Sequence, residues 1–143
     1  MNKLKELINS KLFWLQVAFL LSLSSALGSL ILEHAMNLLP CTLCWWQRIF
    51  MYPLPFILGV ALLQKRFDIF WYAFPIVIVG AGIALYHYLL QIIPRATDFC
   101  GPSVLSCTER QTDLLGFITI PFGSLLAFIG IGTALLMLKK RSS

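Results

Sequence analysis

Charged residues are scarce in this chain. They make up 12% of its 143 residues and only six of them are acidic, whereas hydrophobic residues make up 59%. A soluble globule of this size needs more polar surface, so the composition excludes an ordinary water-soluble enzyme and favours a membrane protein. No basic surface interleaved with aromatic residues is left outside the apolar runs, and we therefore expect no nucleic-acid partner.

Long apolar runs fill most of the chain instead, each close to the roughly 20 residues that a membrane-spanning helix needs. The four runs cover about 12–32, 43–63, 69–93 and 117–138. Because short connections make consecutive helices antiparallel, the sequence predicts an all-α membrane protein, a single domain built as an antiparallel four-helix transmembrane bundle. The first run could instead be a signal peptide cleaved after its small residues at 24–26, but its length favours an uncleaved anchor.

Basic residues are distributed unevenly around these runs. They gather before the first run, between the second and third, and after the fourth, at Lys3, Lys5, Lys11, Lys65, Arg66, Lys139, Lys140 and Arg141. Lysine and arginine in short loops stay on the cytoplasmic side of a membrane, so both termini are expected in the cytoplasm. The loops at about 33–42 and 94–116 then face the extracytoplasmic side.

All four cysteines lie in or beside these two outer loops, where an oxidising compartment permits disulfides. Cys41 and Cys44 end the first loop, and Cys100 and Cys107 lie in the second. This division suggests two pairs, although four cysteines allow three connectivities. Cys41-x-x-Cys44 also fits half of a structural zinc site, but the six-residue spacing of the second pair does not supply the other half, so we expect no metal.

The Cys-x-x-Cys motif opens the second apolar run. A disulfide that closes so small a loop constrains the unfolded chain little, so redox cycling is its natural use. The start of a helix favours a thiolate, and the positive charge of Arg48, one turn beyond Cys44, adds to this effect. On a helix Cys41, Cys44 and Arg48 share one stripe. A thiolate at the bilayer boundary can attack a lipid-soluble electrophile.

Three polar residues are expected to converge near this motif. Arg48 lies about one turn inside the outer boundary, His87 about 9 Å below the end of the third run, and Gln91 one turn above His87. Each has a simpler interpretation, since Arg48 can snorkel towards headgroups and the other two can form interhelical hydrogen bonds. Their common depth beside Cys-x-x-Cys favours a role in the site. His34, near the end of the first run, is more typical of a solvated boundary residue.

Together these residues resemble the DsbB family of bacterial inner-membrane disulfide oxidases. The resemblance covers most of the chain and is carried by His34, Pro40-Cys41-Thr42-Leu43-Cys44 with Arg48, His87-Tyr88-Leu89-Leu90-Gln91, and the segment from Cys107 to Gly116. It implies that a soluble DsbA-like protein of thioredoxin fold gives two electrons to a Cys100/Cys107 disulfide, with Cys100 forming the mixed disulfide. The active site would then lie on the extracytoplasmic side of the inner membrane.

The same resemblance implies where the electrons go next. They pass by thiol exchange to Cys41/Cys44 and then to a membrane quinone, either ubiquinone or menaquinone. Arg48 and His87 would polarise the quinone oxygens, with Gln91 close by, and Arg48 would also hold Cys44 as a thiolate. The cofactor expected from the sequence is therefore a quinone drawn from the lipid bilayer.

One departure from the family pattern concerns the second loop. Better-known members carry a longer segment with a membrane-surface helix between its cysteines, so this chain resembles a short-loop relative. Other classes of membrane protein fit the cysteine pattern less well. Four-helix vitamin K or quinone reductases have their two cysteine pairs in the reverse order, and a conduit for reducing power needs cysteines within the spans. A non-enzymatic membrane subunit with disulfide-stapled loops stays open as an alternative.

Overall fold

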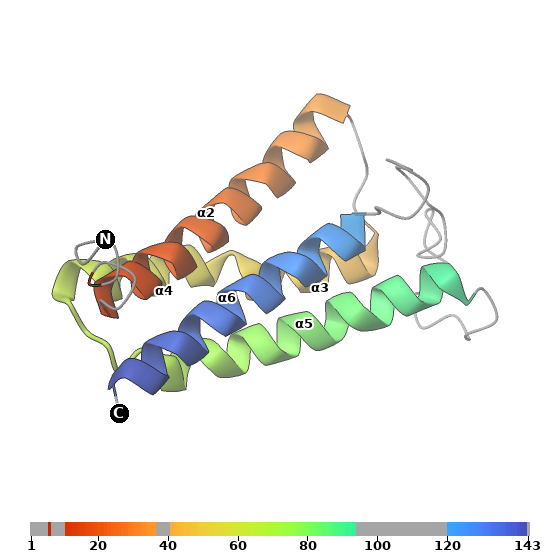
Figure 1. The fold of residues 1–143 in the computed structure, drawn as a ribbon. Coiled ribbons are helices and arrows are strands. Elements are labelled where there is room, and N and C mark those ends of the chain that lie inside the picture. The colour runs from red at the N-terminus through yellow and green to blue at the C-terminus, as the bar shows by residue number, and fades with distance from the viewer. Residues whose placement is uncertain (1–5, 7–10, 37–40, 94–119, 143) are drawn as a thin grey trace.

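The computed structural model describes residues 6, 11–36, 41–93 and 120–142, and the elements in these ranges are helical (Figure 1). Five helices follow one another: α2 (Lys11–Met36), α3 (Thr42–Met51), α4 (Pro53–Gln64), α5 (Phe70–Ile92) and α6 (Ile120–Ser142).

Four helical segments are long and apolar enough to cross a membrane. They are Lys11–Ala35, Thr42–Gln64, Phe70–Ile92 and Ile120–Arg141. Consecutive segments run in opposite directions, so that the start of α2, the connection between α4 and α5, and the end of α6 lie at one end of the bundle (Figure 1). These findings confirm the prediction of an all-α protein with four spans. That this end faces the cytoplasm stays a prediction from the sequence.

The second span consists of two helices. Tyr52 joins them with helical backbone angles, and Pro53 is the first residue of α4. Proline has no backbone N–H, so a hydrogen bond back to the preceding turn is missing at this point. At its other end α4 stops at Lys65, whose positive φ of 52° closes the helix in the left-handed conformation.

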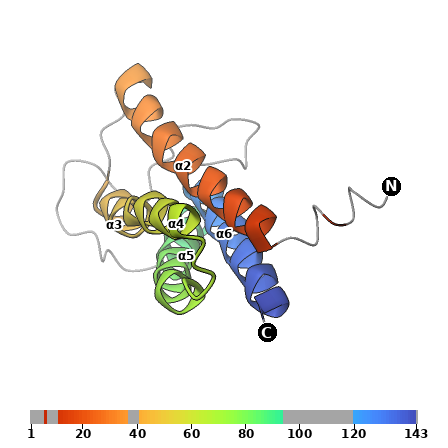
Figure 2. The ribbon, with the colours of Figure 1, turned by 90° about the vertical axis from the view of Figure 1, so that its left-hand side faces the viewer.

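The break in the second span coincides with a change of neighbour. The first half, α3, packs mainly against α5, whereas the second half, α4, packs mainly against α2. Helix α6 contacts both α2 and α5, and so links the two sides of the bundle (Figure 2). We call the end where α3 begins and α5 ends the cysteine end of the bundle.

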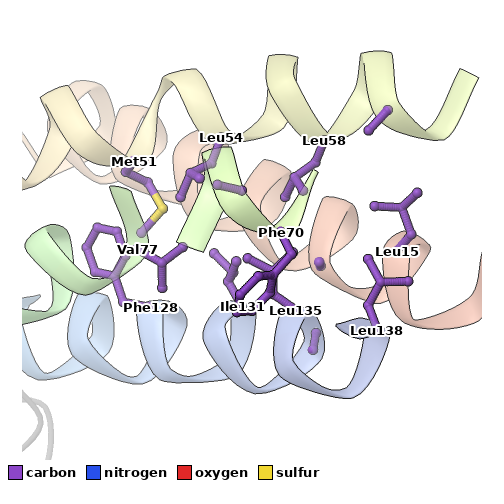
Figure 3. Packing of buried hydrophobic residues seen from close by; sticks show 14 of the residues in the cluster. Leu15, Met51, Leu54, Leu58, Phe70, Val77, Phe128, Ile131, Leu135 and Leu138 are labelled. Carbon is purple, nitrogen blue, oxygen red and sulfur yellow. The ribbon is translucent and has the colours of Figure 1, made fainter. Parts of the chain in front are cut away.

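Buried apolar residues form two separate clusters. The larger cluster, the main core, fills the space between α2, α4, α5 and α6 (Figure 3) and includes Leu15, Leu54, Leu58, Phe128, Ile131 and Leu135. Gly80 on α5 permits this packing, because a Cβ atom there would lie 2.4 Å from the ring of Phe128. The smaller cluster lies at the cysteine end and consists of Cys41, Leu43 and Leu90, with Cys44 and Ile83 packed against it.

Candidate functional site

Cys41 and Cys44 form a contacting pair of free thiols at the start of α3. Cys41 is the N-cap residue and is buried, whereas Cys44 lies in the first turn and is half-buried. Residues three apart on a helix face the same side, which brings the two sulfur atoms to 2.9 Å from each other. The two sulfurs therefore need little movement to close into a disulfide.

His87 of α5 completes this group. Its side chain is only 2% exposed, and its Nε2 lies 3.6 Å from the sulfur of Cys41. Its other ring nitrogen, Nδ1, lies 3.1 Å from Nε2 of Gln47. Because the Gln47 amide donates to Nδ1 in this arrangement, the imidazole proton is on Nε2 and is donated to Cys41. The sequence predicted that His87 lies near Cys-x-x-Cys, and the structure places it directly on Cys41.

A row of hydrogen bonds supports the His87 ring at Nδ1, the nitrogen that does not face Cys41. The hydroxyl of Ser124, on α6, donates to Oε1 of Gln47 at 2.8 Å and also lies 2.9 Å from the carbonyl oxygen of Pro121. Gln47 is itself buried. The row therefore connects α6 through α3 to α5, and it fixes the imidazole against the thiol pair.

Hydrogen bonding favours the thiolate form of Cys41, which lies just before the membrane-spanning segment. The bond from the Cys44 thiol is the largest cause and the contact with His87 adds to it, while burial opposes both, and together they lower the pKa of Cys41 to about 4. The sequence predicts the thiolate at Cys44, beside Arg48. The hydrogen bonds favour Cys41 as the thiolate of the reduced pair instead.

Arg48 forms an ion pair with Glu33 of α2. Its Nη1 lies 2.5 Å from a carboxylate oxygen of Glu33, and its Nε donates to the hydroxyl of Ser29 at 3.0 Å. The two charged side chains are 13% and 29% exposed, so the guanidinium is held inside the protein and does not extend freely into water. It also lies over the ring of Trp45, with 5.9 Å to the ring centroid. The cost of placing a charge at this depth is thus met by an ion pair.

The remaining predicted residues are less closely engaged. Gln91 is half-buried, and its Oε1 is buried without a hydrogen-bond partner among the described residues. His34 is exposed, and its Nδ1 lies 3.2 Å from the carbonyl oxygen of Leu30. Cys100 and Cys107 lie outside the described residues.

Two members of the site were missed in the sequence. Glu33 is one of them: it falls at the start of the predicted outer loop at 33–42, and an acidic residue is a natural partner for an arginine inside the membrane. Gln47, between Trp46 and Arg48, is the other, and an amide in the first turns of a membrane helix needs a hydrogen-bond partner, which is the signal that points to it. Neither pairing follows from spacing along the chain, because each joins two different helices.

The group formed by Cys41, Cys44 and His87 also has the composition of a metal site. One ligand atom from each of these residues lies within 4.8 Å of the other two. Among the described residues no other set of three or more such side chains comes together in this way. The site can therefore perform thiol chemistry and can also offer two sulfurs and one nitrogen to a cation.

Comparison with known proteins gives a consistent family. The family model described as "Disulfide bond formation protein DsbB" matches residues 10–138. Disulfide bond formation protein C of Bacillus subtilis (strain 168) is 39% identical over 138 residues, which cover 95% of this chain and 99% of that protein. The SPbeta prophage-derived disulfide bond formation protein B of the same organism is 37% identical over 126 residues, covering 86% of this chain and 85% of its own length.

A relative from a different organism extends this likeness. A probable disulfide formation protein of Metapseudomonas resinovorans is 35% identical over 131 residues, which cover 90% of this chain and 91% of that protein. No solved structure matches the chain significantly.

Proposed function

The chain belongs to the DsbB family of disulfide bond formation proteins, and from this premise we propose that it is a quinone-coupled thiol oxidase of the bacterial inner membrane. The observation that supports this proposal most directly is the contacting Cys41–Cys44 pair at the start of a membrane-spanning helix, with the buried His87 against Cys41. A pair that only stapled a loop would need neither a thiolate-stabilising histidine nor a place at the membrane boundary.

The electrons enter from a soluble partner of the DsbA type. Its dithiol is oxidised to a disulfide while the Cys100/Cys107 disulfide is reduced, with Cys100 in the mixed disulfide. The new dithiol then reduces the Cys41/Cys44 disulfide by a second exchange. Each exchange transfers two electrons and two protons, so thiols and disulfides stay balanced. This order rests on the family motifs, since the second pair lies outside the described residues.

The proposed electron acceptor is a quinone. DsbA has a potential of roughly −120 mV, so regenerating its disulfide needs an acceptor of higher potential than glutathione. A bound quinone supplies a two-electron acceptor of that kind. The oxidase function therefore requires an oxidant that the bilayer can carry to the thiol pair.

Several residues at the cysteine end of the bundle suit a ligand of this kind. Cys44 is the more accessible of the two cysteines, and Arg48 follows one turn later. The two described hydrogen bonds of Arg48 use Nε and Nη1, and Nη2 can donate to a ligand oxygen. The buried Oε1 of Gln91 can accept from a hydroxyl. Trp45, whose ring lies against the guanidinium of Arg48, is exposed and offers an apolar surface towards lipid. We therefore assign Arg48 and Gln91 to the ligand.

His87 has a different part in this proposal from the one expected in the sequence. Both of its ring nitrogens are engaged, one with Cys41 and the other with Gln47. It therefore stabilises the thiolate of Cys41, the sulfur that exchanges with the second cysteine pair. Gln47 holds the ring in position for this contact.

The proposal is tested by following quinone consumption. The purified protein in detergent receives a reduced DsbA-like partner, and the loss of quinone absorbance is recorded with ubiquinone and menaquinone analogues in parallel. We expect consumption by the wild type and by His34→Ala, a control that changes only an exposed histidine. We expect none by Cys44→Ala. Absence of consumption by a folded wild type, with Cys41–Cys44 oxidised throughout an alkylation trap, would instead indicate a stapled structural subunit.

A further inference from the structure

We propose that Cys41, Cys44 and His87 form a binding site for a thiophilic divalent cation, Zn²⁺ in the first instance, and that the bound cation holds the cysteine pair in its dithiol state. The site uses residues of the proposed oxidase, but its existence does not depend on quinone or on a partner protein. Cysteine spacing alone predicted no zinc site, because the imidazole that completes this one lies 46 residues after Cys41.

The distances between the ligand atoms suit tetrahedral coordination. Zinc lies about 2.3 Å from a thiolate and about 2.05 Å from an imidazole nitrogen, so tetrahedral angles separate sulfur from nitrogen by about 3.6 Å and sulfur from sulfur by about 3.8 Å. Cys41 Sγ and His87 Nε2 are already 3.6 Å apart. The two sulfurs are 2.9 Å apart, and Cys44 must therefore move outward by about 0.9 Å. This movement is open to Cys44 because its side chain is only half-buried.

The charges of the site select a divalent cation. Two thiolates and a neutral imidazole carry two negative charges, so a divalent ion gives a neutral complex, which matters at a membrane boundary where net charge is costly. Thiolate ligands exclude Mg²⁺ and Ca²⁺, which prefer oxygen. The nearby positive charge of Arg48 does not oppose binding, because Glu33 neutralises it through the ion pair.

The residue that can support a metal-bound His87 already lies against its ring. Such a histidine almost always donates its second N–H to an acceptor that fixes the ring. Here Nδ1 of His87 lies 3.1 Å from the Gln47 amide, which turns its oxygen towards the ring when Nε2 binds the ion. The amide nitrogen then donates to Ser124, whose hydroxyl donates to the carbonyl of Pro121 at 2.9 Å. Every polar group in the row keeps a partner.

Three protein ligands leave a fourth position for water, so the ion stays exchangeable. Binding displaces the thiol protons and involves no electron transfer. A disulfide offers no thiolate, so only the reduced pair binds the cation, and the cation in turn withholds both sulfurs from oxidation. A higher concentration of free Zn²⁺ outside the membrane would thus lower the fraction of the protein whose Cys41–Cys44 pair can be oxidised and reduced in turn.

The test uses the full-length protein in detergent with Cys100→Ser and Cys107→Ser, so that Cys41 and Cys44 are its only thiols. After reduction it is titrated with Cd²⁺, whose ultraviolet charge-transfer band reports thiolate ligation, and Zn²⁺ is then measured by competition with a chromophoric chelator. We expect one Cd²⁺ per chain in the reduced protein and none after oxidation to the disulfide. No quinone is present, so failure here leaves the proposed oxidase function untouched, and the reverse also holds.

Variants separate a three-ligand site from simple capture by two thiols. His87→Ala should weaken Cd²⁺ binding by at least about tenfold, and Gln47→Leu by roughly 10 to 100-fold through loss of the support for the ring. His34→Ala, which alters an exposed histidine, should leave affinity unchanged. Equal affinity in the wild type and in both His87→Ala and Gln47→Leu would overturn the proposal. Should His87→Ala fail to fold, as judged by circular dichroism, Gln47→Leu alone decides.

Discussion

Removing the charge of Glu33 should destabilise the cysteine end of the bundle, because Arg48 loses its anionic partner. Fully exposed ion pairs contribute about 0.2–1 kcal/mol, whereas breaking a fully buried pair costs about 3–5 kcal/mol. The side chains of Arg48 and Glu33 are 13% and 29% exposed, between these limits. A hydrogen bond to a charged group contributes about 1.5–3 kcal/mol. We therefore expect a coupling free energy of about 1.5–2 kcal/mol, more than tenfold in the unfolding equilibrium.

The coupling is measured with a double-mutant cycle. The free energy of unfolding in mixed micelles is determined for the wild type, Glu33→Gln, Arg48→Gln and the double variant. Asp68→Asn is a matched control, because it removes the same charge from an exposed residue between α4 and α5. The cycle isolates the pair energy provided that no variant creates a new contact. A coupling below about 0.3 kcal/mol would refute a stabilising Arg48–Glu33 pair and would indicate that Arg48 only snorkels towards the headgroups.

Two further predictions concern packing and pH. Gly80→Ala places a Cβ 2.4 Å from the Phe128 ring and should destabilise the protein by about 1–3 kcal/mol. Gly82→Ala is the control, because its Cβ would meet nothing within 4 Å, and it should be neutral or slightly stabilising. Equal free energies of unfolding for the two variants in micelles would contradict this prediction. The pKa of Cys41 is lowered to about 4, so its thiolate is lost only as the pH falls towards that value, and its alkylation rate should change little between about pH 6 and pH 8, unlike an ordinary thiol with a pKa of about 8.5. Cys44→Ala removes the largest cause of this shift and should restore a steep pH dependence.

The sequence predicts the spans well because each is a long apolar run, and hydropathy needs no knowledge of packing. It places the start of the second helix at Leu43, next to the observed Thr42. It does not predict that Arg48 pairs with Glu33 while His87 pairs with Gln47. Counting residues gives the depth of a side chain in the membrane, but the direction in which it points depends on the rotation of each helix about its axis, which packing decides.

The division of the second span into α3 and α4 explains why the sequence does not predict these side-chain partners. A single straight helix through 43–63 would keep the same neighbours along its length. In the structure a new helix begins at Pro53, and α3 packs mainly against α5 while α4 packs mainly against α2. The partner of His87 is therefore set by a local backbone feature that the apolar pattern does not record.

The thiol pair lies in the smaller apolar cluster and apart from the main core. Proteins open locally in units whose free energies follow the apolar surface that each unit buries. Backbone amides of α3 should accordingly exchange with solvent hydrogen faster than those of α4, although both belong to one span. Thiol exchange needs a sulfur atom to reach its target, and at the cysteine end the backbone can rearrange for it while Leu54, Leu58 and their neighbours remain packed.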